Sequence, residues 1–237
     1  MRLVVLLALA FSLACSGCSR AQNDPAFDAK VRAYLLAHPE IIEEMVEKLN
    51  EKKAAAGVAK LKEALAANRT ALERDPRDFV ANPNGTLTLT EFYDYRCPHC
   101  VNSAGAVLDI VKQNPDVRVV FKELPIFGDV SDKAALAALA VKRAGGDYLA
   151  VWRDFMAAKP LNAEAIDRIL RQHKVDPKVV ETHAADTRKQ VADVQALAVK
   201  LGIEGTPAFI IGDTLVPGED MDAVRAAIVA QRKKAKG

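Results

Sequence analysis

The sequence predicts an α/β fold with an inserted helical subdomain, preceded by an N-terminal helical oligomerisation segment. Three observations support this prediction. Strand-like and helical runs alternate from residue 86 to residue 124. Residues from about 129 to 201 show helical periodicity and no strand of their own, and residues 24–75 are nearly all helical in pattern. With 237 residues, 50% of them hydrophobic, the chain is long enough for one substantial domain and an accessory element.

Residues 1–21 are typical of a signal peptide. A basic start precedes an apolar core at residues 3–14, which is too short to span a bilayer, and small residues follow. We therefore expect export to the periplasm, a compartment that permits disulfides. Cleavage after residue 21 would release a soluble protein. Lipid anchoring at Cys15 or Cys18, each of which follows a small residue, stays open as the alternative.

Residues 22–75 are expected to form a helical stalk. Pro39 should begin a second helical piece, because proline is tolerated in a first turn but not in a helix interior. Apolar residues recur at steps of four and three, as in a coiled-coil seam. The seam comprises Val31, Leu35, His38, Ile42, Met45 and Leu49, and it resumes at Val58, Leu61, Leu65 and Leu72. So narrow a stripe must be covered either by the main domain or by copies of itself, and self-association is favoured.

Residues 74–85, rich in Pro, Asn and Asp, mark the boundary to the main domain, which we place at residues 76–237. Residues 86–95 and 117–124 carry strand patterns, and residues 98–112 between them a helical one. The helical insertion at about 129–201 follows in several pieces. Its breaks are expected at Ala144-Gly145-Gly146, Lys159-Pro160 and Asp176-Pro177.

The chain closes with "PAFIIG" and "TLVPG", which predict a hairpin around Gly212-Asp213, and with a helix from about Glu219. Strand, helix, strand, helical insertion, hairpin and helix is the order of a thioredoxin-like domain that contains a helical subdomain.

Cys97 and Cys100 flank Pro98 and His99 between a predicted strand and a predicted helix. They are the only cysteines outside the signal region. A zinc site needs four ligands, and the histidines lack a suitable spacing. A structural disulfide here would close too small a loop to constrain the unfolded chain much. Redox chemistry is the remaining interpretation, and it requires no metal or organic cofactor.

At a helix start, unpaired backbone N–H groups and the helix dipole favour an anionic sulfur. His99 could add positive charge or donate a hydrogen bond to that sulfur. We therefore expect Cys97 to be an exposed nucleophile and Cys100, one turn further on, its buried partner. A stabilised thiolate makes the disulfide more oxidising, which predicts a donor of disulfides.

"FYDYRCPHC" and "GTPAFIIG" together resemble the DsbA family of bacterial thiol–disulfide oxidoreductases, over about residues 84–235. The resemblance implies that Pro207 is a cis proline facing the disulfide and that Thr206 contacts substrate through its backbone. Thr206 stands where the most strongly oxidising members have valine. It is similar to members with isomerase activity, so both directions of exchange stay open.

Glu91 lies six residues before Cys97 and, by strand alternation, on the same side as Tyr93 and Tyr95. A buried carboxylate there could relay protons to and from Cys100, and the family carries a buried acid at this position. Lys122, in the neighbouring strand, could pair with it. The alternative is an exposed edge residue with an ordinary salt bridge.

The helical stalk is similar to that of the suppressor-of-copper-sensitivity C proteins and Com1-like members. That resemblance implies a homo-oligomer through residues 24–75, with a trimer as the candidate size. Expected partners are exported proteins that are unfolded or wrongly bridged, and a membrane oxidase or reductase. Capture of Cu(I) by the reduced pair is the alternative function. The net charge of +2, without a concentrated basic face, argues against nucleic acid.

Overall fold

The computed structural model describes residues 24–235. The expected signal peptide and the candidate lipid sites Cys15 and Cys18 lie outside these residues. The chain divides into two compact units between Ala56 and Gly57. Within the described range, none of the helices combines the length and the apolar character needed to cross a membrane.

The first unit consists of α1 (Pro25–Ala37) and the beginning of α2 (Glu40–Ala67). The side chain of Asp24 caps α1, because its Oδ1 accepts a hydrogen bond from the Ala26 N–H at 2.9 Å. The helix ends at His38, where the following proline disfavours helical backbone, and α2 begins one residue after Pro39. The predicted break at Pro39 is confirmed. None of residues 24–56 is buried in the single chain.

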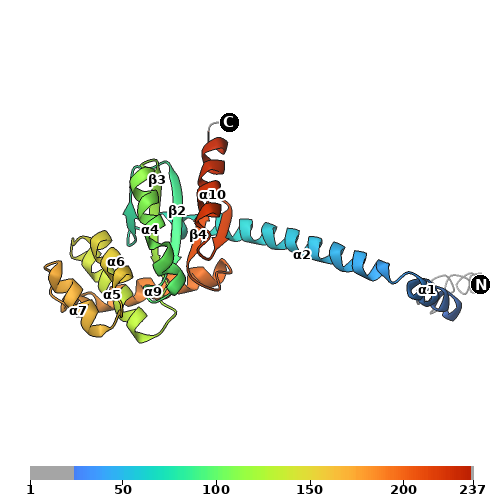
Figure 1. The fold of residues 1–237 in the computed structure, drawn as a ribbon, viewed down its shortest axis with the longest axis horizontal. Helices are drawn as coiled ribbons and strands as arrows, with labels where there is room; N and C mark the ends of the chain where they lie inside the picture. The colour runs from blue at the N-terminus through green and yellow to red at the C-terminus, as the bar shows by residue number, and fades with distance from the viewer. Residues whose placement is uncertain (1–23, 236–237) are drawn as a thin grey trace, which may run out of the picture. The chain divides into compact units, whose positions relative to one another are not determined.

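A five-stranded sheet forms the centre of the second unit (Figure 1). The strand order is β1-β3-β2-β4-β5, with β2 and β3 parallel and the other neighbouring strands antiparallel. The strands are β1 (Phe79–Ala81), β2 (Leu87–Tyr93), β3 (Val117–Glu123), β4 (Ala208–Ile211) and β5 (Thr214–Pro217). The predicted strands and hairpin are confirmed. The sequence prediction missed β1, which lies in the stretch expected to be a boundary and pairs with the outer edge of β3.

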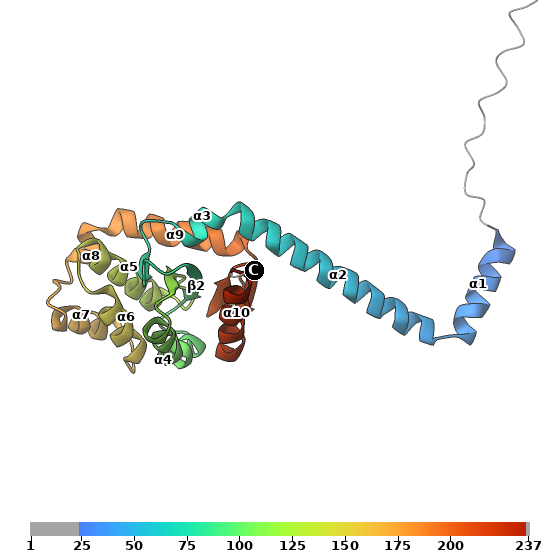
Figure 2. The same ribbon diagram turned by 90° about the horizontal axis from the view of Figure 1, so that it is seen from above.

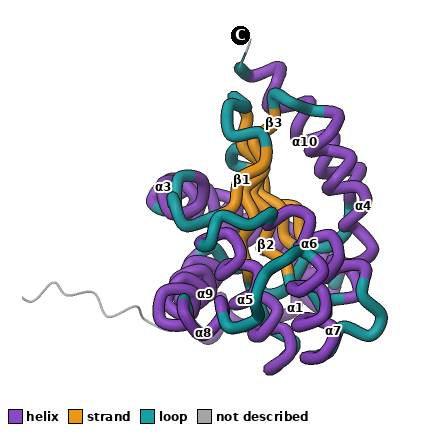
Figure 3. Tube along the Cα trace, turned by 90° about the vertical axis from the view of Figure 1, so that its left-hand side faces the viewer, coloured by secondary structure: helices purple, strands orange, loops and turns teal. Residues whose placement is uncertain are grey.

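Helices cover both faces of this sheet (Figure 3). One face carries α4 (Pro98–Gln113) and α10 (Met221–Lys234), and the other carries α3 (Arg69–Glu73) and α9 (Ala184–Lys200). Leu65, near the end of α2, and Leu72 are fully buried in a cluster with Phe92 and Ile210. The last part of the expected stalk therefore packs on its own domain, and the two units divide inside α2 rather than at residues 75–76.

The helical insertion lies between β3 and β4, and its helices are labelled in Figure 2. They are α5 (Asp129–Arg143), α6 (Tyr148–Ala157), α7 (Ala163–Gln172), α8 (Val179–Thr182) and α9. The three predicted breaks all fall between these helices. Trp152 and Phe155 of α6 are buried, and their rings meet those of Tyr93 and Tyr95 edge-on at 6.0 and 5.3 Å between centroids. The insertion thus shares the core of the sheet.

Candidate active site

Cys97 is the N-cap residue of α4, and Pro98 occupies the first turn of the helix. Proline suits this position because its φ angle is already helical and a donor there would lack a partner. Asp94 shapes the turn from β2 into α4: its backbone oxygen accepts from the Cys97 N–H at 3.2 Å, and its Oδ1 accepts from the Arg96 N–H at 2.7 Å. The predicted location of Cys97 at a helix start is confirmed.

The Asp94 carboxylate also binds the chain that leads into the insertion. Its Oδ2 accepts from the N–H groups of Ile126 at 2.6 Å and Phe127 at 3.0 Å. Its Oδ1 accepts from the Ser131 hydroxyl, in the first turn of α5, at 2.8 Å. One buried side chain thus joins the turn before Cys97 to the start of the helical insertion.

Both cysteines are free thiols, and both are buried. The Cys97 side chain donates to the backbone oxygen of Thr206 at 3.1 Å, and the residue is only 1% exposed. The prediction that Cys97 is exposed is therefore wrong, because the segment at Thr206 and Pro207 lies against its sulfur. The Thr206–Pro207 peptide bond is cis, as the resemblance implied.

Cys100 lies one turn into α4 and is fully buried, as predicted. Burial is the main cause that raises the pKa of its thiol far above the ordinary value, and the negative charge of Glu91 raises it further. A sulfur in such a place resists ionisation, so it needs a proton when its bond to Cys97 opens.

The His99 side chain is 63% exposed, and its Nδ1 lies 3.2 Å from Oε1 of Glu219. The expected hydrogen bond from His99 to the Cys97 sulfur is not formed in this structure, because the sulfur pairs with Thr206 and the ring faces Glu219. Sequence reasoning missed Glu219, which comes from the connection between β5 and α10, far along the chain from His99.

Glu91 lies on β2, which has β3 on one side and β4 on the other. Its register neighbours are Phe121 and Phe209, and its carboxyl oxygens have no hydrogen-bond partner in the described part of the chain. Burial raises its pKa to about 8, and the negative charge of Glu123 contributes. The expectation of a buried carboxyl is confirmed, and the alternative of an exposed edge residue is wrong.

Lys122 does not pair with Glu91. Its register partner is Phe92, so its side chain lies on the opposite face of the sheet from Glu91. There Nζ forms a buried ion pair with Asp78 and donates to the backbone oxygen of Ala71 at 2.6 Å. Pairing with Glu91 was a wrong prediction, because adjacent positions in aligned strands face opposite sides. Lys122 ties β3 to the segment before β1.

A second buried carboxyl group, Glu123, was missed. Its Oε1 accepts hydrogen bonds from the hydroxyls of Tyr95 at 2.8 Å and Tyr148 at 2.7 Å. Burial raises the pKa of Glu123 above its ordinary value, although the hydrogen bonds from tyrosine act in the opposite direction. A signal existed in the sequence: Glu123 closes the apolar strand of residues 117–124 at a position that strand alternation places on the same face as Phe121.

Comparison with known proteins agrees with this geometry. A family model described as the DSBA-like thioredoxin domain matches residues 88–229, more than half of the chain. The chain belongs to this family. A second model, described as the copper resistance protein ScsC N-terminal domain, matches residues 26–56, which cover α1 and the first part of α2.

Solved structures of DSBA-like proteins are similar over most of the chain. A linker-deletion variant of Proteus mirabilis ScsC is 31% identical, with a TM-score of 0.70, covering 92% of this chain and 99% of that one. A thioredoxin-like oxidoreductase from Silicibacter pomeroyi is 37% identical, with a TM-score of 0.66, covering 70% and 98%. A periplasmic thioredoxin-like protein from Salmonella enterica serovar Typhimurium is 29% identical, with a TM-score of 0.62, covering 68% and 94%.

Curated relatives are longer proteins. The Na(+)/H(+) antiporter NhaA 1 of Salinispora arenicola is 29% identical over 166 residues, which are 66% of this chain and 25% of that protein. The chain thus spans about a quarter of that relative.

Membership of the DSBA-like family makes the chain a thiol–disulfide oxidoreductase with a thioredoxin-like fold. The structure brings Cys97, Cys100, Thr206, Pro207 and Glu91 to one site, with His99 at its rim. Within residues 24–235, no cluster of three or more potential metal ligands is formed. Thiolates are ligands that suit a soft metal ion, and Cys97 and Cys100 are the two thiols of this site.

Proposed function

We propose that this DSBA-like protein forms or isomerises disulfide bonds in exported proteins of the periplasm, through Cys97 and Cys100. The observation that carries the proposal is the arrangement of the two sulfurs. Cys97 lies at a helix start against the Thr206 carbonyl, while Cys100 lies beneath it in an apolar core beside a carboxyl group. This asymmetry gives the two sulfurs different roles.

In the oxidative direction, a client thiolate attacks Sγ of Cys97 in the Cys97–Cys100 disulfide. The bond between the two cysteines breaks, and Cys100 leaves with the electron pair and takes up a proton. A second client thiolate then attacks the client sulfur of the mixed disulfide, which releases Cys97 as a thiolate. The client gains one disulfide, and the protein is left as the dithiol.

In the isomerising direction, reduced Cys97 attacks a wrong disulfide of the client, and Cys100 releases the protein if no client thiol resolves the mixed disulfide. In both directions, backbone N–H groups at the start of α4 stabilise the Cys97 thiolate. The backbone of Thr206, next to Cys97, is available to pair with an extended client segment. A membrane oxidase or reductase would set the redox state of the pair and so the direction of exchange.

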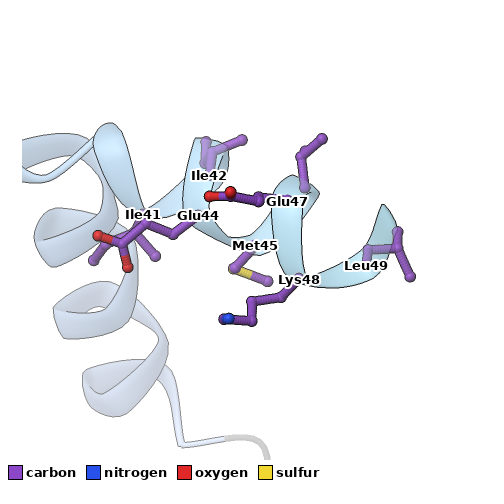
Figure 4. Close-up of a pocket in the computed structure, with 8 residues that line it drawn as sticks. Ile41, Ile42, Glu44, Met45, Glu47, Lys48 and Leu49 are labelled. Atoms are coloured by element: carbon purple, nitrogen blue, oxygen red, sulfur yellow. The ribbon is translucent and has the colours of Figure 1, made fainter. Parts of the chain in front are cut away.

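We also propose that the protein is a homo-oligomer, with a trimer as the candidate size, and that residues 24–56 hold it together. Five of the six predicted seam residues within this segment are exposed in the single chain: Val31, Leu35, Ile42, Met45 and Leu49. Figure 4 shows a hollow along α2 that is lined by Ile41, Ile42, Met45 and Leu49, together with charged residues. Helices this exposed are marginal in water unless a partner covers their apolar side chains.

Capture of Cu(I) is the second candidate function. The description of the family that matches residues 26–56 refers to copper resistance, and two thiolates suit a soft monovalent ion. In this alternative the reduced pair would bind Cu(I) and pass it on. The likeness to a periplasmic thioredoxin-like protein of Salmonella supports the proposed periplasmic location, which suits either function.

Refolding of scrambled ribonuclease and reduction of insulin test the proposed function. The wild-type chain should accelerate both reactions. Cys97→Ser should lose both activities, while Cys100→Ser should accumulate mixed disulfides with its clients. Activity retained without Cys97 would overturn the proposal. Titration of the reduced protein with Cu(I) against a competing chelator separates the second candidate, which requires tight binding that both serine variants lose.

A further inference from the structure

Glu123 is a second carboxyl group on the face of the sheet that carries Glu91, and the exchange reaction described above does not use it. Glu91 pairs in register with Phe121, and Glu123 pairs with Tyr93, so the two acids lie two positions apart on neighbouring parallel strands. Glu91 is 0% exposed and Glu123 is 2% exposed. Their side chains therefore share one region of the core.

The two carboxyl groups differ in their hydrogen-bond donors. Oε1 of Glu123 accepts from Tyr95 and Tyr148, and the Tyr148 hydroxyl is also bonded to that of Tyr93. Glu91 has no such donor among the described residues. Hydroxyl donors stabilise a carboxylate more than they stabilise a carboxylic acid. When the pair holds a single proton, the charge therefore belongs on Glu123 and the proton on Glu91.

The other groups that face Glu123 act in both directions. The hydroxyls of Tyr93, Tyr95 and Tyr148 favour charge on Glu123, whereas the Asp94 carboxylate opposes it by raising the pKa of Glu123. The groups that face Glu91 are Glu123 and Cys100, together with the register neighbours given above. Lys122, the cation of β3 next to Glu123, lies on the opposite face, paired with Asp78. A second negative charge in this region is therefore costly.

We propose that Glu123 is a positioning residue of the exchange reaction, whose carboxylate keeps a proton on Glu91, beside the Cys100 sulfur. The inference rests on the proposed function. When a client thiolate opens the disulfide, Cys100 leaves as a thiolate, and the Glu91 O–H donates its proton to that sulfur and becomes a carboxylate. Repulsion by Glu123 then favours the return of a proton to Glu91 from solvent. Reoxidation of the pair runs the same transfer in reverse.

Infrared difference spectra of the full-length protein, recorded through a pH titration, test the proposal. The wild type should show a buried carboxylic-acid band of Glu123, which titrates first, and one of Glu91, which persists to about pH 8. Glu91→Gln should leave the first band and remove the persistent band. Glu123→Gln should retain it and move its midpoint down by about one pH unit or more, because a neighbouring negative charge is gone. Glu164→Gln, which changes an exposed acid on α7, should alter neither the band nor its midpoint.

An unchanged midpoint in Glu123→Gln would overturn the proposal, as would loss of the persistent band in Glu123→Gln instead of Glu91→Gln. Tyr148→Phe provides a second test that retains both carboxyl groups. With one donor removed, the lower of the two titration steps should move to higher pH, and a step that stays in place would contradict the assigned order.

The rate at which glutathione opens the disulfide, divided by the glutathione thiolate concentration, is measured over the same pH range. In the wild type and in Glu123→Gln, this rate should fall at the midpoint of the Glu91 band. A rate that does not fall at this midpoint would overturn the proposed proton transfer from Glu91 to Cys100. If the band shifts as expected but no exchange with protein clients occurs, the proposed function is wrong. The inference that Glu123 keeps a proton on Glu91 would still hold.

Discussion

The predicted apolar seam has two halves that end in opposite environments. The large apolar seam residues up to Val58, such as Met45, remain exposed in the single chain, whereas Leu65 and Leu72 are fully buried against the sheet. The same spacing of apolar residues thus serves two purposes. In the second half it fixes a helix on its own domain, and in the first half it leaves a surface that, in our proposal, only another copy covers.

The largest effect is expected from charges placed on the exposed half. The double variant Ile42→Glu and Met45→Glu should convert the oligomer to a monomer, because carboxylates on the seam would be buried without partners in the assembly. Analytical ultracentrifugation of the full chain measures this. Lys48→Glu, an exposed change in the same part of α2, should keep the mass of the wild type. A monomeric wild type would remove the proposed assembly.

Matched truncations compare the two halves by stability. Leu72→Ala should lower the free energy of unfolding of the second unit by about 2–5 kcal/mol, because it leaves a cavity in a packed core. Leu36→Ala, at a residue that is 67% exposed, should change it by less than about 0.5 kcal/mol. Urea unfolding followed by the fluorescence of Trp152, the single tryptophan, measures both variants. Equal losses would contradict the division of the chain into two units.

Glu91 should make the second unit less stable as pH rises. Its pKa is raised to about 8 in the folded chain, so folding keeps a proton that the unfolded chain releases near its ordinary pKa. The stability is complete below that ordinary pKa and declines from about pH 5 to about pH 8, at about 1.4 kcal/mol for each unit of pKa difference. Thermal unfolding of Glu91→Gln should show a weaker decline over this range. A decline equal to that of the wild type would mean that other groups cause it.

The smallest effect is expected at the rim of the site. The Glu219 side chain is 38% exposed, and its ion pair with His99 is screened by solvent. Glu219→Gln should therefore shift the equilibrium of the Cys97–Cys100 couple with glutathione by less than about fivefold, which corresponds to about 1 kcal/mol. A tenfold shift would show that this exposed pair influences the sulfurs as strongly as buried groups do.

Local patterns predicted the framework of the fold and the location of the reactive pair. The strand before Cys97 and the helix that starts after it determine where the two cysteines lie. Both elements can be recognised from the pattern of about twenty residues. The breaks of the helical insertion were predicted for the same reason. Strand β1 was missed because three residues carry little pattern and are held by the free edge of β3.

Contacts between distant segments could not be predicted in this way. Every residue of β3 is buried, so its sequence does not show which side chains share a face with Glu91, and Lys122 was assigned to the wrong face. The exposure predicted for Cys97 failed because Thr206, 109 residues away in sequence, covers the sulfur. Glu123 gains one of its two tyrosine partners, Tyr148, from α6, an element of the insertion.

The carboxylate of Asp94 sets a condition on any redesign of this domain. It accepts hydrogen bonds both from the turn before Cys97 and from the first residues of the helical insertion. Neither segment can therefore be redesigned without the other. A chimaera that borrows its insertion from a relative would need an acceptor at this position and matching donors across the junction. Without them, the position of the Cys97 sulfur would change whenever the helical insertion is replaced.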